Sequence, residues 1–184
     1  MLTKKKLTKS TYKEIIIMSN PKIKIVVEGF GEMYAELYPD VAPATVQNFM
    51  NLVRQKFFDG LIFHRVIPGF MIQGGGFDTN FDQKEAKSIK GEFRANGFKN
   101  DLKHERGVLS MARTSAPNSA SSQFFIMHAR APHLDGQYAA FGKVYEGLDV
   151  IDKIANVPTT IKMWMYQDCP RKDVVITTIE EIAE

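Results

Sequence analysis

Two short segments of this sequence combine polar and apolar side chains in a way that suits a binding site. The first, residues 63–76 (FHRVIPGFMIQGGG), carries Arg65 inside an apolar run. A guanidinium there is costly unless it reaches solvent, a carboxylate or a ligand. In the second, residues 121–125 (SSQFF), Gln123 and Phe125 share one face at strand spacing. Such mixed faces suit a concave site with apolar walls and a few fixed polar groups, and they equally fit ordinary edge strands.

Signals for other kinds of chemistry are weaker. The triple glycine at residues 74–76 lacks the Lys-Ser/Thr pair of a phosphate-binding loop. No Gly-x-Ser-x-Gly motif marks a nucleophilic serine. The histidines are dispersed, with no pair at metal-ligand spacing, so we predict no metal site (His64, His104, His128 and His133). We interpret His104 as a surface residue and His128 as a strand residue. We expect His64 to be a strand side chain held by hydrogen bonds.

The composition bounds the class of protein. The chain has 184 residues, 44% hydrophobic and 24% charged, which is typical of one globular domain. Its 24 basic and 21 acidic residues are interleaved, so a net charge of +3 gives little reason to expect nucleic acid or membrane partners. The single cysteine, Cys169, excludes an intramolecular disulfide and fits a reducing compartment. The apolar run at residues 15–18 is too short for a signal peptide, so we expect a cytoplasmic protein.

The elements that must position these residues can be read from the hydrophobic periodicity. Residues 1–20 read as a disordered extension and residues 21–184 as one domain, with a Lys-rich nucleic-acid arm as the alternative for the extension. Amphipathic helices are expected over residues 43–57 and 150–157. Alternating or apolar runs predict strands, separated by a long polar loop at residues 77–106 (22–28, 33–38, 61–66, 70–73, 107–112, 123–128, 138–145 and 174–179). Many short strands with two helices favour a closed antiparallel barrel.

Four motifs, in order and spacing, resemble the cyclophilins, the family of peptidyl-prolyl cis-trans isomerases. They are residues 63–76, 109–113 (LSMAR), 122–126 (SQFFI), and 134–136 (LDG) followed by 141–144 (FGKV). The resemblance extends over about residues 22–181. Residues 111–120 and Tyr138 are more similar to the bacterial single-domain branch than to the eukaryotic one.

The resemblance implies a fold and a set of site residues. The fold is mainly β, a closed eight-stranded antiparallel barrel capped by two α-helices, with a packed interior and the site on its outer face. Arg65 and Gln73 are implied as catalytic residues. The other implied residues bind substrate, the apolar ones as a pocket for the proline ring (Phe70, Met71, Phe125 and Leu134) and the rest as backbone contacts and rim (His64, Ala112, Arg113, Gln123, His133 and Tyr138). Because His133 replaces a tryptophan of drug-sensitive members, we expect cyclosporin-type inhibitors to bind weakly.

The expected function follows from this resemblance. The chain is predicted to be a monomeric isomerase that rotates X–Pro bonds in proline-containing peptides and in unfolded or folding proteins. Rotation breaks no covalent bond, so the reaction needs no cofactor, metal, nucleophile or proton transfer. The alternative is a proline-peptide binding or chaperone-like module with little turnover. Arg65 favours the enzyme, since a pure binder has no need of a charge beside the prolyl nitrogen.

Overall fold

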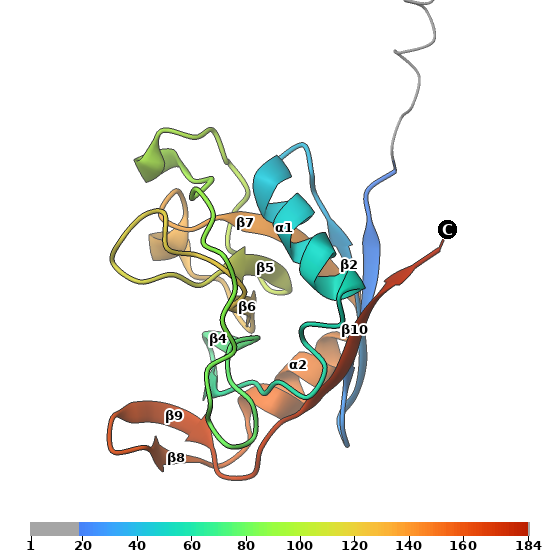
Figure 1. Ribbon diagram of the computed structural model, residues 1–184, viewed down its shortest axis with the longest axis vertical. Helices are drawn as coiled ribbons and strands as arrows, with labels where there is room; N and C mark the ends of the chain where they lie inside the picture. Colours follow the sequence, from blue (N-terminus) through green and yellow to red (C-terminus); the bar gives the residue numbers. More distant parts are fainter. Residues whose placement is uncertain (1–18, 184) are drawn as a thin grey trace, which may run out of the picture.

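The computed structural model describes residues 19–183, so nearly all of the expected N-terminal extension lies outside the described residues. Eight strands form one antiparallel sheet in the order β10-β1-β2-β7-β5-β6-β4-β3. Their bounds are β1 (Lys22–Val27), β2 (Gly31–Leu37), β3 (Arg65–Ile67), β4 (Met71–Gly74), β5 (Val108–Met111), β6 (Phe124–Met127), β7 (Ala140–Glu146) and β10 (Ile176–Ile182). Figure 1 shows the sheet curled on itself, with α1 (Pro43–Arg54) toward one end and α2 (Leu148–Ala155) toward the other.

The sheet is a half-barrel, and the expectation of a closed barrel is not confirmed. The outermost strands, β10 and β3, share no ladder in the described part of the chain. A single antiparallel bridge between Ile62 and Val175 joins the two edges, flanked by the backbone bond from Phe63 N–H to Val174 O at 2.9 Å. The chain meets the β10 edge with residues near 62 and meets β4 with residues 65–67. No single strand therefore pairs with both β10 and β4.

Phenylalanine rings fill the interior. Phe49 projects from α1 into the curl of the sheet, where its ring centroid lies 5.3 Å from Phe124 and 5.1 Å from Phe141. The alternation of β1 buries Ile23, Ile25 and Val27. Burial of apolar surface at about 25 cal/mol per Å² is the main stabilising contribution of such a core. Both helices form where the periodicity predicts them, although α1 ends at Arg54 because Lys56 adopts a left-handed backbone (φ +55°).

The long polar segment between β4 and β5 is anchored to the first helix. It contains one short 3₁₀ turn, η1 (Arg94–Asn96). Buried Glu92 accepts hydrogen bonds from the backbone N–H groups of Ala44 (3.0 Å) and Thr45 (2.8 Å) and from the Thr45 hydroxyl (2.6 Å). A carboxylate at a helix N-terminus satisfies free N–H donors and complements the helix dipole. Glu92 therefore caps α1 from 47 residues away.

A second, two-stranded sheet was not predicted. It is a hairpin of β8 (Thr159–Lys162) and β9 (Tyr166–Pro170), and β9 lies beside β3. In Figure 1 this hairpin projects from the lower left of the molecule. Its turn carries Trp164, which is fully exposed. Within residues 19–183, no helix combines the length and the apolar character needed to cross a membrane.

Candidate active site

Cross-strand register brings the candidate residues into one row on the outer face of the sheet. Arg65 on β3 pairs with Gln73 on β4, and Gln73 pairs with Phe125 on β6. Directly paired residues point to the same side of a sheet. The residues between them point inward, and Ile72 and Phe124 are fully buried in the barrel core. Along these strands, inward side chains fill the packed interior, and the outward side chains that alternate with them place a cation, an amide and an aromatic ring side by side.

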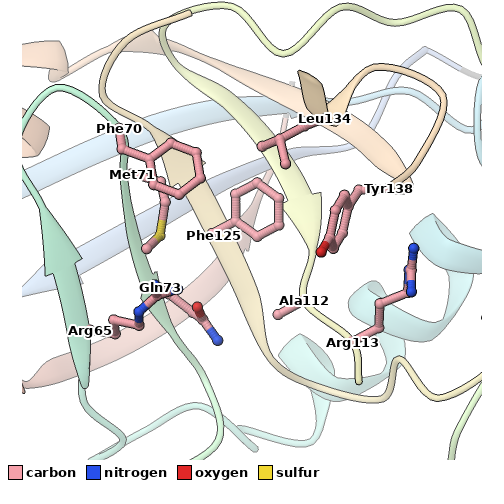
Figure 2. A pocket seen from close by; sticks show the side chains of 9 residues that line it. All are labelled: Arg65, Phe70, Met71, Gln73, Ala112, Arg113, Phe125, Leu134 and Tyr138. Atoms are coloured by element: carbon pink, nitrogen blue, oxygen red, sulfur yellow. The ribbon is translucent and has the colours of Figure 1, made fainter. Parts of the chain in front are cut away.

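Nine of the twelve predicted site residues surround one cavity of about 200 Å³ (Arg65, Phe70, Met71, Gln73, Ala112, Arg113, Phe125, Leu134 and Tyr138). Figure 2 shows Phe70, Met71, Phe125 and Leu134 gathered on one side, with Arg65 and Gln73 at the other end. Met71, Phe125 and Leu134 belong to a buried cluster that is separate from the barrel core. The cavity is therefore apolar at its floor and polar along one edge, as suits an uncharged ring with a polar bond attached.

The turn that carries Phe70 is fixed by His128. The backbone N–H of Gly69 donates to His128 Nδ1 at 2.8 Å, and Phe70 O accepts a bond from the backbone N–H of His128 at 2.9 Å. On the other side of the ring, His128 Nε2 lies 2.9 Å from an oxygen of Asp152 on α2. Accepting at Nδ1 and donating at Nε2 defines the neutral Nε2–H tautomer. Our interpretation of His128 as a plain strand residue missed this link between α2 and the pocket.

The polar edge is held by two side chains, Asp168 of β9 and Gln123, which directly precedes β6. Asp168 of β9 places a carboxylate oxygen 3.9 Å from Arg65 Nε. Gln73 Nε2 donates to Gln123 Oε1 at 3.1 Å. The triple glycine makes room for this amide pair, since a Cβ on Gly76 would lie 2.4–2.7 Å from the Gln123 side chain. Residues 74–76 are thus a close-packing device, in line with our view that they do not bind phosphate.

Arg113 is part of the cavity wall rather than a free cation. Its guanidinium lies over the rings of Phe93 (4.7 Å) and Tyr138 (4.6 Å). It also donates to the carbonyl oxygens of Thr114 (3.0 Å) and Gln137 (2.8 Å). A guanidinium that is stacked and hydrogen-bonded in this way stabilises the folded structure. Arg113 therefore fixes the Tyr138 ring at the rim, while Ala112 is held to Gln123 O by its backbone N–H at 3.0 Å.

Three predicted residues lie beside the cavity instead of on it. His133 is exposed and stacks on Phe70 with ring centroids 5.7 Å apart. Gln123 and His64 line a second, adjoining hollow. His64 is buried against Phe77 at 4.8 Å, and its Nδ1 has no hydrogen-bond partner among the described residues. The expectation that hydrogen bonds hold His64 is wrong: aromatic packing holds it.

His104 is a buried support for the pocket floor, which corrects our interpretation of it as a surface residue. Its Nδ1 lies 3.1 Å from Asp135 Oδ1, and its Nε2 lies 2.9 Å from Ser110 Oγ. The imidazole stacks on Phe125 at 6.1 Å. Burial lowers the pKa of His104, with Asp135 opposing the shift. Because the Ser110 hydroxyl is fully buried, this Asp-His-Ser series positions Phe125 and offers no accessible nucleophile.

The comparisons with known proteins agree with this geometry. A family model described as cyclophilin type peptidyl-prolyl cis-trans isomerase/CLD matches residues 22–181. The chain belongs to the cyclophilin family. A peptidyl-prolyl cis-trans isomerase of Acinetobacter baylyi is 49% identical over 156 residues, covering 82% of this chain and 80% of that one. Peptidyl-prolyl cis-trans isomerase B of Escherichia coli is 45% identical over 158 residues, covering 81% and 93%. The expected similarity to bacterial members is confirmed.

Solved structures support the same assignment. A crystal structure of a cyclophilin type isomerase from Cryptosporidium parvum superposes with a TM-score of 0.77 at 28% identity, covering 90% of this chain and 99% of that chain. This cyclophilin is therefore a peptidyl-prolyl cis-trans isomerase that uses no cofactor.

Acid should destabilise this cyclophilin through His64. Burial, and then the charge of Arg65, lowers the pKa of His64 from 6.5 to about 4. Between these pH values the unfolded chain binds a proton that the folded chain does not. The contribution of neutral His64 to the free energy of unfolding is therefore fully present above about pH 6.5 and is lost progressively toward pH 4. Near pH 5 the loss amounts to about 2 kcal/mol.

The measurement is the free energy of unfolding in denaturant at about pH 7.5 and about pH 5 for the wild type and His64→Gln. The difference between the two pH values should be smaller in the variant by about 2 kcal/mol. Subtraction cancels the contribution of His104, whose pKa burial also lowers. An identical acid loss in both proteins would show that His64 does not have a depressed pKa.

Proposed function

We propose that this cyclophilin rotates X–Pro bonds by donating a hydrogen bond from Arg65 to the prolyl nitrogen, and that it thereby assists protein folding. The barrier to rotation, roughly 18–20 kcal/mol, is the resonance energy of the amide. In the twisted transition state the nitrogen becomes pyramidal and gains a lone pair. A donor aimed at that lone pair stabilises the transition state more than the planar ground state, which is the condition for catalysis.

The observation that carries this proposal is the place of Arg65 beside the apolar cavity. A guanidinium is charged at every physiological pH and offers five donors. Asp168 approaches Arg65 at Nε, 3.9 Å away, and Arg65 lines the cavity. The proline ring would be held by Phe70, Met71, Phe125 and Leu134, while Gln73, fixed by Gln123, would bind the substrate backbone. Water kept from the ring cannot stabilise the charge-separated planar amide.

The proposed partners are proline-containing peptides and unfolded or folding chains. In support, a Cryptosporidium parvum cyclophilin type isomerase, 29% identical with a TM-score of 0.75 and covering 89% of this chain and 99% of that one, was crystallised in the presence of the dipeptide Ala-Pro. We further propose a monomer that binds cyclosporin-type inhibitors weakly. The single cysteine favours a reducing compartment, the cytoplasm.

A short X–Pro peptide tests the enzyme against the binding-module alternative. NMR exchange spectroscopy measures both the cis-trans interconversion rate and the chemical shifts that report binding. We expect catalytic amounts of the protein to accelerate interconversion. Shifts without acceleration would establish the binding module. The folding role is tested separately by adding the protein to a refolding chain whose slow phase is a prolyl isomerisation, which takes tens to hundreds of seconds uncatalysed.

A further inference from the structure

The tip of the β8–β9 hairpin is an exposed apolar cluster that the proline pocket does not use. Ile161, Met163, Trp164 and Met165 are 61%, 60%, 101% and 72% exposed, and we call these four residues the apolar tip. Single exposed apolar residues are common, but a contiguous group of them marks an interaction site. Among the exposed large hydrophobic residues of the described chain, only Tyr145 lies elsewhere.

The backbone conformation of the tip is unfavourable for the residues that it carries. Met163 and Trp164 both have left-handed backbone conformations, with φ of +49° and +65°. This region favours glycine and asparagine and is strained for other residues. The turn therefore presents a large indole to solvent at a position where a small residue would be more stable. Features that are retained at a cost to stability are typical of functional sites.

A hollow connects the apolar tip to the active site. It has a volume of about 570 Å³ and lies between the hairpin, which contributes Met165, Tyr166 and Asp168, and the face that carries Arg65 and Gln73. Arg65 and Gln73 also line the proline cavity, so the two hollows adjoin at these residues. A chain leaving the proline cavity past Arg65 has the hairpin directly beside its path.

The strand residues on either side of the turn are anchored, so that the turn projects. The Tyr166 ring packs on Phe77 at 5.5 Å and on Phe81 at 5.0 Å. Lys162 is bound to Asp173 at 2.6 Å. The tip is thereby held at a set distance from Arg65. Trp164 lies four residues before Asp168, which approaches Arg65, and β9 begins only at Tyr166, so the span between them is at most roughly 13 Å.

We propose that the apolar tip binds a hydrophobic segment of the same client chain whose proline occupies the active site. This inference rests on the proposed function, and it adds a second subsite with a defined spacing. An extended chain advances about 3.3–3.6 Å per residue, so the subsite receives an apolar side chain about three to five residues from the proline. The occupant is an unfolded polypeptide, because hydrophobic segments beside prolines are exposed before folding and buried afterwards.

Other occupants fit the tip less well. A stable interface between two copies contains about 20–30 residues on each side, far more than the four residues of the tip. An anionic membrane surface attracts uncompensated lysines and arginines. On the hairpin, however, Lys162 is neutralised by Asp173, and Asp168 adds a negative charge beside the hollow.

The experiment compares five peptides and three proteins. One peptide is a tetrapeptide with one X–Pro bond. The other four are longer and carry either leucine or serine three to five residues from the proline, on the N-terminal side in one pair and on the C-terminal side in the other. The proteins are the wild type, Trp164→Asn and Tyr145→Asn. Asparagine tolerates the left-handed backbone, so Trp164→Asn removes the indole without endangering the turn. Tyr145 is a half-exposed aromatic residue of β7 and lines neither hollow, which makes it a matched control.

We expect the wild type to bind the leucine peptide with a KM about tenfold lower than the serine peptide, at similar kcat. Trp164→Asn should remove most of that tenfold preference, and Tyr145→Asn should keep it. Turnover of the tetrapeptide should be unchanged in both variants, because it is too short to reach the tip. Trp164 is the only tryptophan in the chain, so its fluorescence should shift to the blue when the leucine peptide is added.

The outcomes separate this inference from the proposed function. A wild type that fails to turn over the tetrapeptide would contradict the proposed function, while the fluorescence shift would still test the tip. An unmoved emission together with an unchanged leucine preference in Trp164→Asn would overturn the inference. It would also be overturned by a Trp164-dependent doubling of mass in light scattering, or by a blue shift that anionic phosphatidylserine vesicles cause and the leucine peptide does not.

Discussion

Replacing Arg65 by alanine should lower kcat/KM for a short X–Pro peptide by about a hundred- to a thousandfold and leave the fold intact. Loss of one preorganised donor to a transition state costs about 2.7–4 kcal/mol. The Arg65 side chain is 42% exposed on the outer face of β3, so its removal opens no cavity in the core. The measurement is a protease-coupled or NMR exchange assay, with circular dichroism to establish folding.

Two variants make this result specific. Arg65→Lys keeps the charge and loses the planar fork of donors, so it should recover only part of the activity. Arg54→Ala removes another exposed arginine, whose partner is Glu181 at 3.0 Å on β10, away from the cavity. That control should retain full turnover. Near-wild-type kcat/KM in a folded Arg65→Ala protein would contradict the proposed mechanism.

Replacing His133 by tryptophan should strengthen the binding of a cyclosporin-type inhibitor by about thirty- to more than a hundredfold. His133 is exposed and already stacks on Phe70, so a larger ring at the same place would extend the apolar wall of the pocket outward. An indole covers several tens of Å² more apolar ligand surface and adds one N–H donor. Together these are worth roughly 2–3 kcal/mol, which is the stated change in affinity.

Peptide turnover by His133→Trp, measured in parallel, separates the rim from the pocket. In the proposed binding mode the proline ring contacts Phe70, Met71, Phe125 and Leu134, so kcat/KM for a short peptide should change by less than about threefold. Arg130→Trp adds an indole at an exposed position three residues away and should not affect the inhibitor. An unchanged inhibitor affinity in His133→Trp, or an equal change in turnover, would mean that rim and pocket are not separable.

The strand alternation carried most of what the sequence predicted correctly. Period-two spacing placed Gln123 and Phe125 on one face, and the register then set Phe125 beside Gln73 and Arg65. The helices followed from apolar spacing in the same way, because packing against the core enforces the period of 3.6. Both signals are local, so a single segment contains the information needed.

The features that the sequence did not predict depend on contacts between residues that are distant in sequence. His104 stands in a polar stretch, and only the fold brings Asp135 and Ser110 to its two ring nitrogens. Glu92 caps a helix 47 residues earlier, which no local capping pattern reveals. The β8–β9 hairpin escaped prediction because Met163 and Trp164, unlike the usual glycine or asparagine, gave no sign of a turn. Barrel closure likewise depends on where two distant segments meet, at Ile62 and Val175.

The two-faced strands β3, β4 and β6 allow specificity and stability to be changed independently. A substitution at an inward position such as Ile72 alters core packing, whereas one at the partly exposed Gln73 alters the outer cavity. Free-energy changes from sites without shared partners add to within about 0.5 kcal/mol. Libraries that vary the outer positions should therefore yield folded proteins with altered peptide preferences at high frequency. The exceptions are the buried residues Met71, Phe125 and Leu134, where a change of ligand preference is also a change of fold stability. The Phe125 ring in addition rests on buried His104.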